Sequence, residues 1–314
     1  MVSDSVRRAV VQCLMARMLR AALVLSLLGM LPACHRHAIS TVPGAPGDPV
    51  LSIIGDPESE SGATWTLVGR LGGRRVDLEG ILLKPRGRGP FPAVVLSHGA
   101  GGNAARYGGG LGGVMRTWGL VCIAVNYTHA SGVPIGAPGG SLQQGASPAN
   151  VLRAHAAVTV LARLRYVDTR RVAAHGHSMG AFVTTAFASA YPDDVRVASH
   201  TSGGVLLDAL HKEEMPLPSV EEARRIRAPY QWHHGLLDYA VPFLLDRRLD
   251  AVLTAPHEGY LYPRFRHAEV AADPLVLSRI RAWYTTHGLF DAVVAATSGS
   301  MPPAARARED APVP

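Results

Sequence analysis

The segment at residues 171–180, RVAAHGHSMG, constrains the fold of this chain more than any other. Residues 172–174 are apolar and typical of a buried strand, whereas residues 181–191 predict a mostly apolar helix that ends before Pro192. A strand that passes directly into a helix is a unit of an α/β fold, and Ser178 lies at the turn between the two.

This turn has the pattern Gly-x-Ser-x-Gly, with Gly176 and Gly180 on either side of Ser178. A serine in such a turn has a strained backbone conformation that exposes its Oγ. Glycines flank it because a side chain at either position would collide with the strand or the helix. A chance match is the alternative, since the chain contains 33 glycines. The strand–turn–helix context favours Ser178 as a catalytic nucleophile.

Strands and helices alternate along the rest of the chain. Strands are predicted at residues 64–68, 75–83, 92–97, 120–126, 172–175, 195–200, 230–233 and 258–262, and helices at residues 114–118, 148–164, 181–191, 220–225, 241–253 and 274–286. This alternation predicts an α/β fold with a mainly parallel central sheet and helices on both faces. The chain between residues 200 and 230 is too short for a large cap domain, so none is expected.

The N-terminal part of the chain predicts export. Arginines precede an apolar stretch at residues 21–31, which is too short to span a bilayer but suits a signal peptide over residues 1–33. The stretch ends in LPAC, which resembles the lipobox of bacterial lipoproteins and implies a lipid anchor at Cys34 in the periplasm or outer membrane. Ordinary cleavage after Ala33, giving a secreted protein, and an uncleaved signal anchor are the alternatives.

Composition divides the remaining chain into three parts. Residues 34–61 are rich in Pro, Gly, Ser and Asp and predict a flexible tether. Residues 62–290 carry the alternating elements and predict one catalytic domain, and residues 291–314 predict a disordered tail. The net charge is +7, but no dense basic run marks a nucleic-acid groove, so no nucleic-acid partner is expected. Contact with a membrane is expected only through the lipid anchor.

Few residues suit a metal or a cofactor. The three cysteines supply no disulfide framework or metal site, and Cys122 lies in an apolar run that predicts burial. The His-Gly-His and His-His pairs share no helical spacing with a carboxylate, so no metal is expected. Residues 108–113 fit the dinucleotide pattern G-x-G-x-x-G, but they do not directly follow a strand and no acidic residue lies about twenty positions on. We interpret them as a flexible entry to a short helix, and expect no cofactor.

A nucleophilic serine needs a base, and the base needs an acid. In enzymes with the G-x-S-x-G turn, the acid and then the histidine follow on loops after later strands. Residues 230–242 read YQWHHGLLDYAVP, which places Asp238 on a loop after a short strand. The alternative is a turn aspartate, but Asp246 and Asp250 lie in a predicted helix and fit worse. Asp238 is therefore the predicted acid.

The predicted base is His267, which follows the strand at residues 258–262. A histidine on the loop beyond the last strand is what a Ser-His-Asp triad requires. His257 precedes that strand and His287 follows the last helix, so neither has the required place.

Acyl transfer also needs hydrogen-bond donors for the developing oxyanion. The sequence SHGAGG at residues 97–102 follows a predicted strand, and its small residues leave backbone N–H groups exposed. We assign the oxyanion hole to the N–H groups of Ala100 and Met179, the second of which lies at a helix N-terminus. A plain turn is the alternative for this segment.

The motifs HGAGG, GHSMG and HGLLDYAVP, followed by His267, resemble the dienelactone hydrolase and prolyl-oligopeptidase-like branch of the α/β-hydrolase superfamily. The resemblance covers residues 62–290 and implies an α/β-hydrolase fold. Dienelactone hydrolases are similar but use a cysteine nucleophile, so Ser178 indicates a serine esterase. Many relatives have a glycine where this chain has Ala181, and we expect little effect.

The expected activity is cleavage of carboxylic ester bonds through an acyl-enzyme intermediate. The loop at residues 128–147 is rich in Gly and Pro and leaves the end of a strand where α/β proteins bind ligands. An uncapped site would accept small-molecule or polymer-linked esters. A peptidase or amidase with the same triad, and a catalytically silent binding protein of the cell envelope, are the alternatives. The sequence gives no indication of the oligomeric state.

Overall fold

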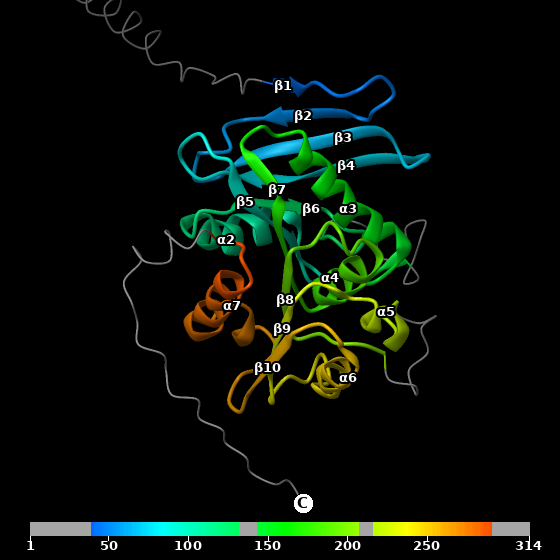
Figure 1. Cartoon of the computed structure of the whole chain (residues 1–314), viewed down its shortest axis with the longest axis vertical. Helices are drawn as coiled ribbons and strands as arrows, with labels where there is room; N and C mark the ends of the chain where they lie inside the picture. Colours follow the sequence, from blue (N-terminus) through cyan, green and yellow to red (C-terminus); the bar gives the residue numbers. More distant parts are fainter. Residues whose placement is uncertain (1–38, 132–142, 207–215, 291–314) are drawn as a thin grey trace, which may run out of the picture. The chain divides into compact units, whose positions relative to one another are not determined.

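The computed structural model describes residues 39–131, 143–206 and 216–290 (Figure 1). The predicted signal peptide, the anchor residue Cys34 and the predicted tail at residues 291–314 lie outside the described residues, as does part of the loop at residues 128–147. In these described segments, no helix has both the length and the apolar character needed to cross a membrane.

The described strands form one ten-stranded sheet with the order β1-β2-β3-β4-β6-β5-β7-β8-β9-β10. The strands are β1 (Ile39–Val42), β2 (Val50–Ile54), β3 (Ala63–Leu71), β4 (Arg74–Leu83), β5 (Phe91–Ser97), β6 (Val121–Val125), β7 (Val167–His177), β8 (Val197–Thr201), β9 (Tyr230–Gly235) and β10 (His257–Tyr262). Strands β1 to β4 pair antiparallel, as do β4 and β6, whereas all pairings from β6 to β10 are parallel.

Helices cover both faces of this sheet (Figure 1). They are α2 (Ala104–Thr117), α3 (Pro148–Ala162), α4 (Met179–Ala190), α5 (Val220–Arg224), α6 (Leu244–Val252), α7 (Pro274–Thr286) and a short 3-10 helix, η2 (Glu269–Ala271). Helices α2 and α7 share one apolar core, and helices α3 to α6 contribute to the core of the other face. The prediction of an α/β fold with a mainly parallel sheet between two helical layers is confirmed.

The central strand β5 contributes side chains to the apolar cores on both faces of the sheet. Its residues Ala93 and Val95 face the core beneath α3 and α4, while Val94 and Leu96 face the core beneath α2 and α7. All four are essentially inaccessible to solvent. A continuous apolar run without polar alternation is what a strand covered on both faces requires.

The prediction of a tether over residues 34–61 is wrong for the described part of that segment. Strands β1 and β2 lie within it, and β2 pairs antiparallel with β3. Residue Leu51 of β2 is fully buried, so the folded domain begins well before Gly62. The strands are only four and five residues long and are separated by Pro and Gly, so no sustained periodicity marks them in the sequence.

The glycine run at residues 108–113 lies inside helix α2, not in a flexible entry to a short helix. The helix begins after Asn103, whose side chain accepts a hydrogen bond from the Arg106 N–H at 2.8 Å. A Cβ atom at Gly108 would lie 2.4 Å from Ile81 Cγ2 on strand β4. A Cβ atom at Gly112 would likewise lie 3.1 Å from Leu96 Cδ1, so these two glycines allow the helix to pack closely against the sheet.

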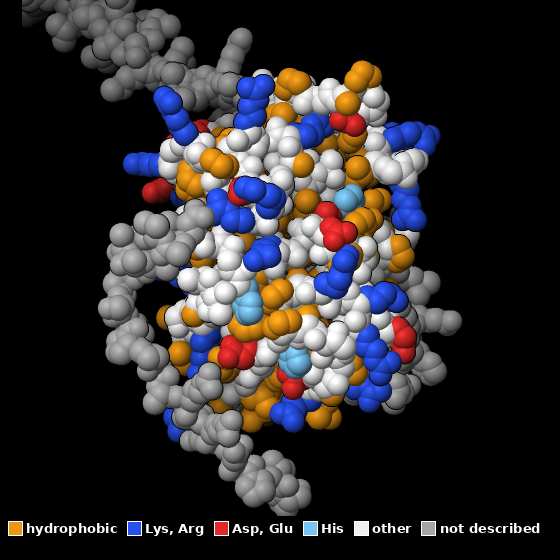
Figure 2. All heavy atoms as spheres, viewed as in Figure 1, with side chains coloured by type: hydrophobic (Ala, Val, Ile, Leu, Met, Phe, Trp, Pro, Cys, Tyr) orange, Lys and Arg blue, Asp and Glu red, His pale blue; other side chains and the backbone are white. Residues whose placement is uncertain are grey.

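The surface charge is spread out on the face shown in Figure 2. Lys and Arg side chains are scattered over the whole of this face among neutral and acidic ones. On this face they form no continuous basic stripe of the kind that tracks a nucleic-acid backbone.

Candidate active site

Ser178 forms the turn between strand β7 and helix α4, because β7 ends at His177 and α4 begins at Met179. Its backbone has φ 57° and ψ −124°, in the positive-φ region that residues other than glycine rarely adopt. The surrounding structure must hold this strained conformation in place, and such strain is concentrated at functional sites. The turn presents Ser178 at the carboxyl edge of the sheet.

Close packing accounts for the two flanking glycines. A Cβ atom at Gly176 would lie 2.3 Å from the carbonyl oxygen of Gly180, and one at Gly180 would lie 2.0 Å from the carbonyl oxygen of Ser97. Both obstacles are backbone atoms, which cannot rotate away. The glycines therefore let β7, α4 and the end of β5 meet at the turn.

Asp238 lies on the loop after β9, with 8% of its surface exposed. Its Oδ1 accepts hydrogen bonds from the backbone N–H groups of Ala240 and Val241, each at 2.9 Å. Burial acts to raise the pKa of Asp238, but hydrogen bonds from His267 and the Val241 amide outweigh it and lower the pKa overall. The carboxylate is thus held ionised in one orientation, with Oδ2 facing His267.

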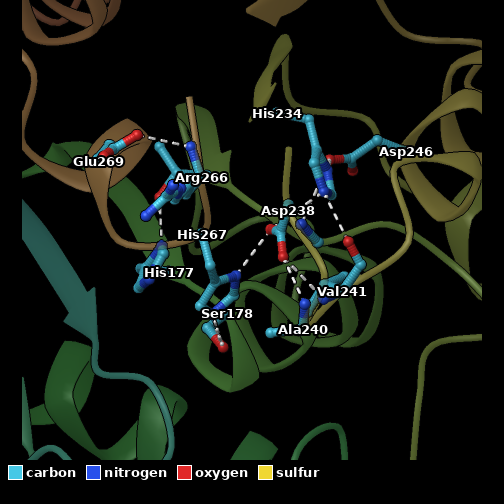
Figure 3. Close-up of polar contacts among 12 residues, drawn as sticks. His177, Ser178, His234, Asp238, Ala240, Val241, Asp246, Arg266, His267 and Glu269 are labelled. Atoms are coloured by element: carbon cyan, nitrogen blue, oxygen red, sulfur yellow. Dashed lines mark hydrogen bonds and ion pairs between the residues drawn. The ribbon is translucent and has the colours of Figure 1, made fainter. Parts of the chain in front are cut away.

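His267 bridges the other two predicted residues from the segment after β10 (Figure 3). Its Nδ1 lies 2.7 Å from Asp238 Oδ2, and its Nε2 lies 2.8 Å from Ser178 Oγ. In the neutral ring, Nδ1–H donates to the carboxylate and the serine hydroxyl donates to Nε2. The parallel strands β7, β9 and β10 end at the same edge of the sheet, which brings together three residues that are far apart in the sequence.

The predicted oxyanion segment also lies beside Ser178. A Cβ atom at Gly99 would be 3.2 Å from Ser178 Cβ, so the loop after β5 passes close to the serine. The N–H of Ala100 donates to no other residue that the structure describes. Met179 is the first residue of α4, and the first N–H groups of a helix have no acceptor within it. Both predicted donors are therefore available to a ligand.

His98, Tyr127 and His129, to which the sequence assigned no role of their own, support this loop. The ring of His98 accepts a hydrogen bond from the Tyr127 N–H at Nε2 (3.2 Å), and its Nδ1 lies 2.9 Å from the Gly99 carbonyl. The His129 Nε2 lies 3.0 Å from the His98 carbonyl oxygen. Burial lowers the pKa of His98 and that of His129, the latter to about 4, so both rings stay neutral. No sequence signal beyond the histidines themselves indicated these contacts.

A second histidine ring contacts the His267 ring. The two ring centroids of His177 and His267 lie 4.8 Å apart, and His177 Nδ1 lies 2.9 Å from Thr201 Oγ1. Burial, with the nearby His267 as the next cause, lowers the pKa of His177 to about 4. This ring therefore adds no charge beside His267 near neutral pH.

Other arrangements in the described residues offer weaker chemistry. No group of three or more His, Cys, Asp or Glu side chains there is placed to hold a metal ion. A cavity of about 260 Å³ lies between β4 and α3, with Arg74, Arg75 and Arg153 among its lining residues. None of the three predicted catalytic residues lines this cavity, so it is separate from the candidate active site.

Comparison with known proteins agrees with the architecture. No protein-family model matches the chain, and no curated protein matches it in sequence. Similar solved structures include a puromycin-hydrolysing peptidase of Mycobacterium tuberculosis (TM-score 0.56, 19% identity, covering 78% of this chain and 46% of that one). Acetyl xylan esterase 1 of a Thermoanaerobacterium species has a TM-score of 0.53 and 15% identity, over 81% of this chain and 88% of that one. A candidate dienelactone hydrolase of Klebsiella pneumoniae has a TM-score of 0.54 and 16% identity, over 79% of this chain and 97% of that one.

The chain has the α/β-hydrolase fold, as the resemblance of its motifs predicted. It spans less than half of the length of the tuberculosis peptidase, but most of the length of the xylan esterase.

Proposed function

We propose that this protein is a serine hydrolase that cleaves carboxylic ester bonds, with Ser178 as nucleophile, His267 as general base and Asp238 as the acid that orients it. One observation carries the proposal. Ser178 Oγ donates to His267 Nε2 at 2.8 Å, and His267 Nδ1 donates to Asp238 Oδ2 at 2.7 Å, so the three side chains form a continuous chain of hydrogen bonds. These lengths suit proton transfer between positioned groups without rearrangement.

In the first half-reaction, Ser178 Oγ attacks the ester carbonyl carbon while His267 Nε2 takes the hydroxyl proton. The N–H groups of Ala100 and Met179 would stabilise the negative oxygen of the tetrahedral intermediate. Its collapse breaks the bond to the alcohol, and His267 gives the proton to the departing oxygen. Water then attacks the acyl-enzyme in the same way, which releases the carboxylic acid and restores Ser178.

Two observations support an ester substrate. Acetyl xylan esterase 1 shares this architecture over 88% of its own length. The loop that carries Asp238 also presents exposed apolar side chains, including Leu236, Leu237 and Tyr239, the last 90% exposed. Such a surface suits the apolar part of a bulky or polymer-linked ester.

A series of p-nitrophenyl esters of increasing acyl length, assayed beside the matched p-nitroanilides, tests this preference. We expect turnover of the esters, with the ratio of kcat/KM between chain lengths defining the acyl site, and little turnover of the anilides. Faster cleavage of the anilides would favour the peptidase alternative. Absence of turnover for both series would favour the binding-protein alternative.

We also propose that the protein is exported and anchored by a lipid on Cys34, which rests on the sequence LPAC alone. Mass spectrometry of the N-terminal peptide from the native host tests it. An unmodified Cys34 would contradict the anchor without bearing on the catalytic proposal.

A further inference from the structure

A buried group of acidic and imidazole side chains lies behind the carboxylate of Asp238 (Figure 3). It consists of His234 on β9, Asp246 on α6 and His200 on β8, and the side chain of each is completely buried. Burying charged or polar groups in this way is costly unless every one of them is paired.

Among the described residues, the ring nitrogens of His234 contact only hydrogen-bond acceptors. Its Nδ1 lies 2.6 Å from Asp246 Oδ2. Its Nε2 lies 3.0 Å from the Val241 carbonyl oxygen and 3.3 Å from Asp238 Oδ2. A neutral imidazole has only one N–H, so both sides of this ring are satisfied only in the imidazolium form.

The contacts of Asp246 agree with this assignment. Its Oδ1 lies 2.6 Å from His200 Nε2, and its Oδ2 also accepts a hydrogen bond from the Gly203 N–H at 3.2 Å. The other nitrogen of His200 lies 2.9 Å from the Tyr230 hydroxyl, which also lies 2.8 Å from Thr185 Oγ1. A hydroxyl is able to donate to an unprotonated ring nitrogen, so His200 has a partner that a single N–H would leave satisfied. Neither nitrogen of His234 has such a hydroxyl partner in the described part of the chain, so the contacts of this ring require two protons whichever way the Tyr230 hydroxyl points.

The pKa directions are consistent with an ion pair. Burial acts to raise the pKa of Asp246, but the contacts with His200 and His234 outweigh it, and the net shift is strongly downward. Burial acts to lower the pKa of His234, but the hydrogen bond and charge of Asp246, followed by the Val241 carbonyl and Asp238, raise it overall. The ionised Asp246 thus stabilises the protonated His234.

We infer that Asp246 and His234 form a positioning pair for the triad. Protonated His234 contacts the Asp238 carboxylate on the side away from His267, fixes its orientation and partly offsets its negative charge. This inference rests on the proposed function of Ser178, Asp238 and His267. A cation on the far side of Asp238 weakens the attraction of that carboxylate for a proton on His267. The enzyme should then keep its activity to lower pH than it would with an uncompensated carboxylate at this place.

The variant Asp246→Asn tests the pair. Its amide keeps the shape of the side chain but removes the negative charge that stabilises the imidazolium, so we expect His234 to become neutral. We expect the acidic midpoint of the kcat/KM profile on an ester to move to higher pH by about one pH unit, as loss of a nearby charge typically causes. The same upward shift is expected for His234→Gln, which removes the cation directly.

Asp250→Asn is the matched control. Asp250 lies on the same helix α6 and accepts a hydrogen bond from Trp232 Nε1 at 2.9 Å, but it contacts neither His234 nor Asp238. A purely structural role of Asp246 would lower stability or kcat and leave the acidic midpoint in place. The other titratable groups near His234 are His177, His200 and His267, of which His177 stays neutral at the pH values compared.

Nuclear magnetic resonance of the ¹⁵N-labelled imidazoles in Ser178→Ala gives a readout that needs no turnover. We expect both ring nitrogens of His234 to be protonated at pH 7. A neutral His234, or acidic midpoints that coincide in the wild type, Asp246→Asn and His234→Gln, would overturn the inference. Failure of the wild type to hydrolyse any ester would instead contradict the proposed function, and the state of His234 would still be measured.

Discussion

Replacing Ser178 by alanine is expected to lower kcat on a p-nitrophenyl ester by about 10⁶-fold, the size of effect seen when a triad nucleophile is removed. The hydroxyl is the atom that forms the acyl-enzyme, and no other hydroxyl contacts His267 in the described residues. Steady-state rates of purified wild type and variant, measured at the pH of maximal activity, give the ratio.

The fold should survive this change. Alanine at residue 178 keeps the same φ of 57°, and the serine side chain has only His267 as its hydrogen-bond partner in the described part of the chain. Thermal denaturation should therefore differ little between the two proteins. Ser278→Ala, an exposed position on helix α7, serves as a control that should keep full activity. Retention of more than a few per cent of activity in Ser178→Ala would exclude this serine as the nucleophile.

Asp238→Asn is expected to cost about 10⁴-fold in kcat, because an amide in this position selects the wrong imidazole tautomer. The loop determines which way the amide lies. The N–H groups of Ala240 and Val241 donate to Oδ1, so the asparagine oxygen must take that place and its NH₂ group must face His267 Nδ1. The ring then carries its proton on Nε2 and cannot accept one from Ser178. Rates on the same ester, with single-turnover kinetics to separate acylation from release, measure the effect.

The exposed Asp193→Asn is the control for this substitution, and we expect it to leave kcat unchanged. The double variant Ser178→Ala with Asp238→Asn should be no slower than Ser178→Ala alone, because residues that act as a unit are not additive. An Asp238→Asn variant within tenfold of the wild type, or additive losses in the double variant, would separate Asp238 from the chemistry.

The elements that place the site could be predicted from the sequence because each has a local cause. Residues 171–191 combine an apolar run, a glycine-flanked serine and an apolar helix, and the structure has β7, the turn and α4 there. The order of Ser178, Asp238 and His267 along the chain also predicted which side chains would meet. Their convergence requires only that parallel strands end at one edge of a sheet.

Other features depend on tertiary packing and had no local signal. Strands β1 and β2 exist because they extend the sheet beyond β3, which a four- or five-residue run cannot reveal. Helix α2 contains a glycine run that disfavours helix, and the close packing of Gly108 and Gly112 against the sheet appears only in three dimensions. The sequence predicts Asp246 only as a helical residue, yet helix α6 brings it to 2.6 Å from His234.

The central claim is that Ser178 is an activated nucleophile, and labelling with a fluorophosphonate followed by mass spectrometry tests it most directly. The account predicts one covalent adduct per chain on the peptide containing Ser178, none in Ser178→Ala, and much slower labelling in His267→Ala because the base is missing. A wild-type protein that stays unlabelled, or an adduct on a different residue, would contradict it.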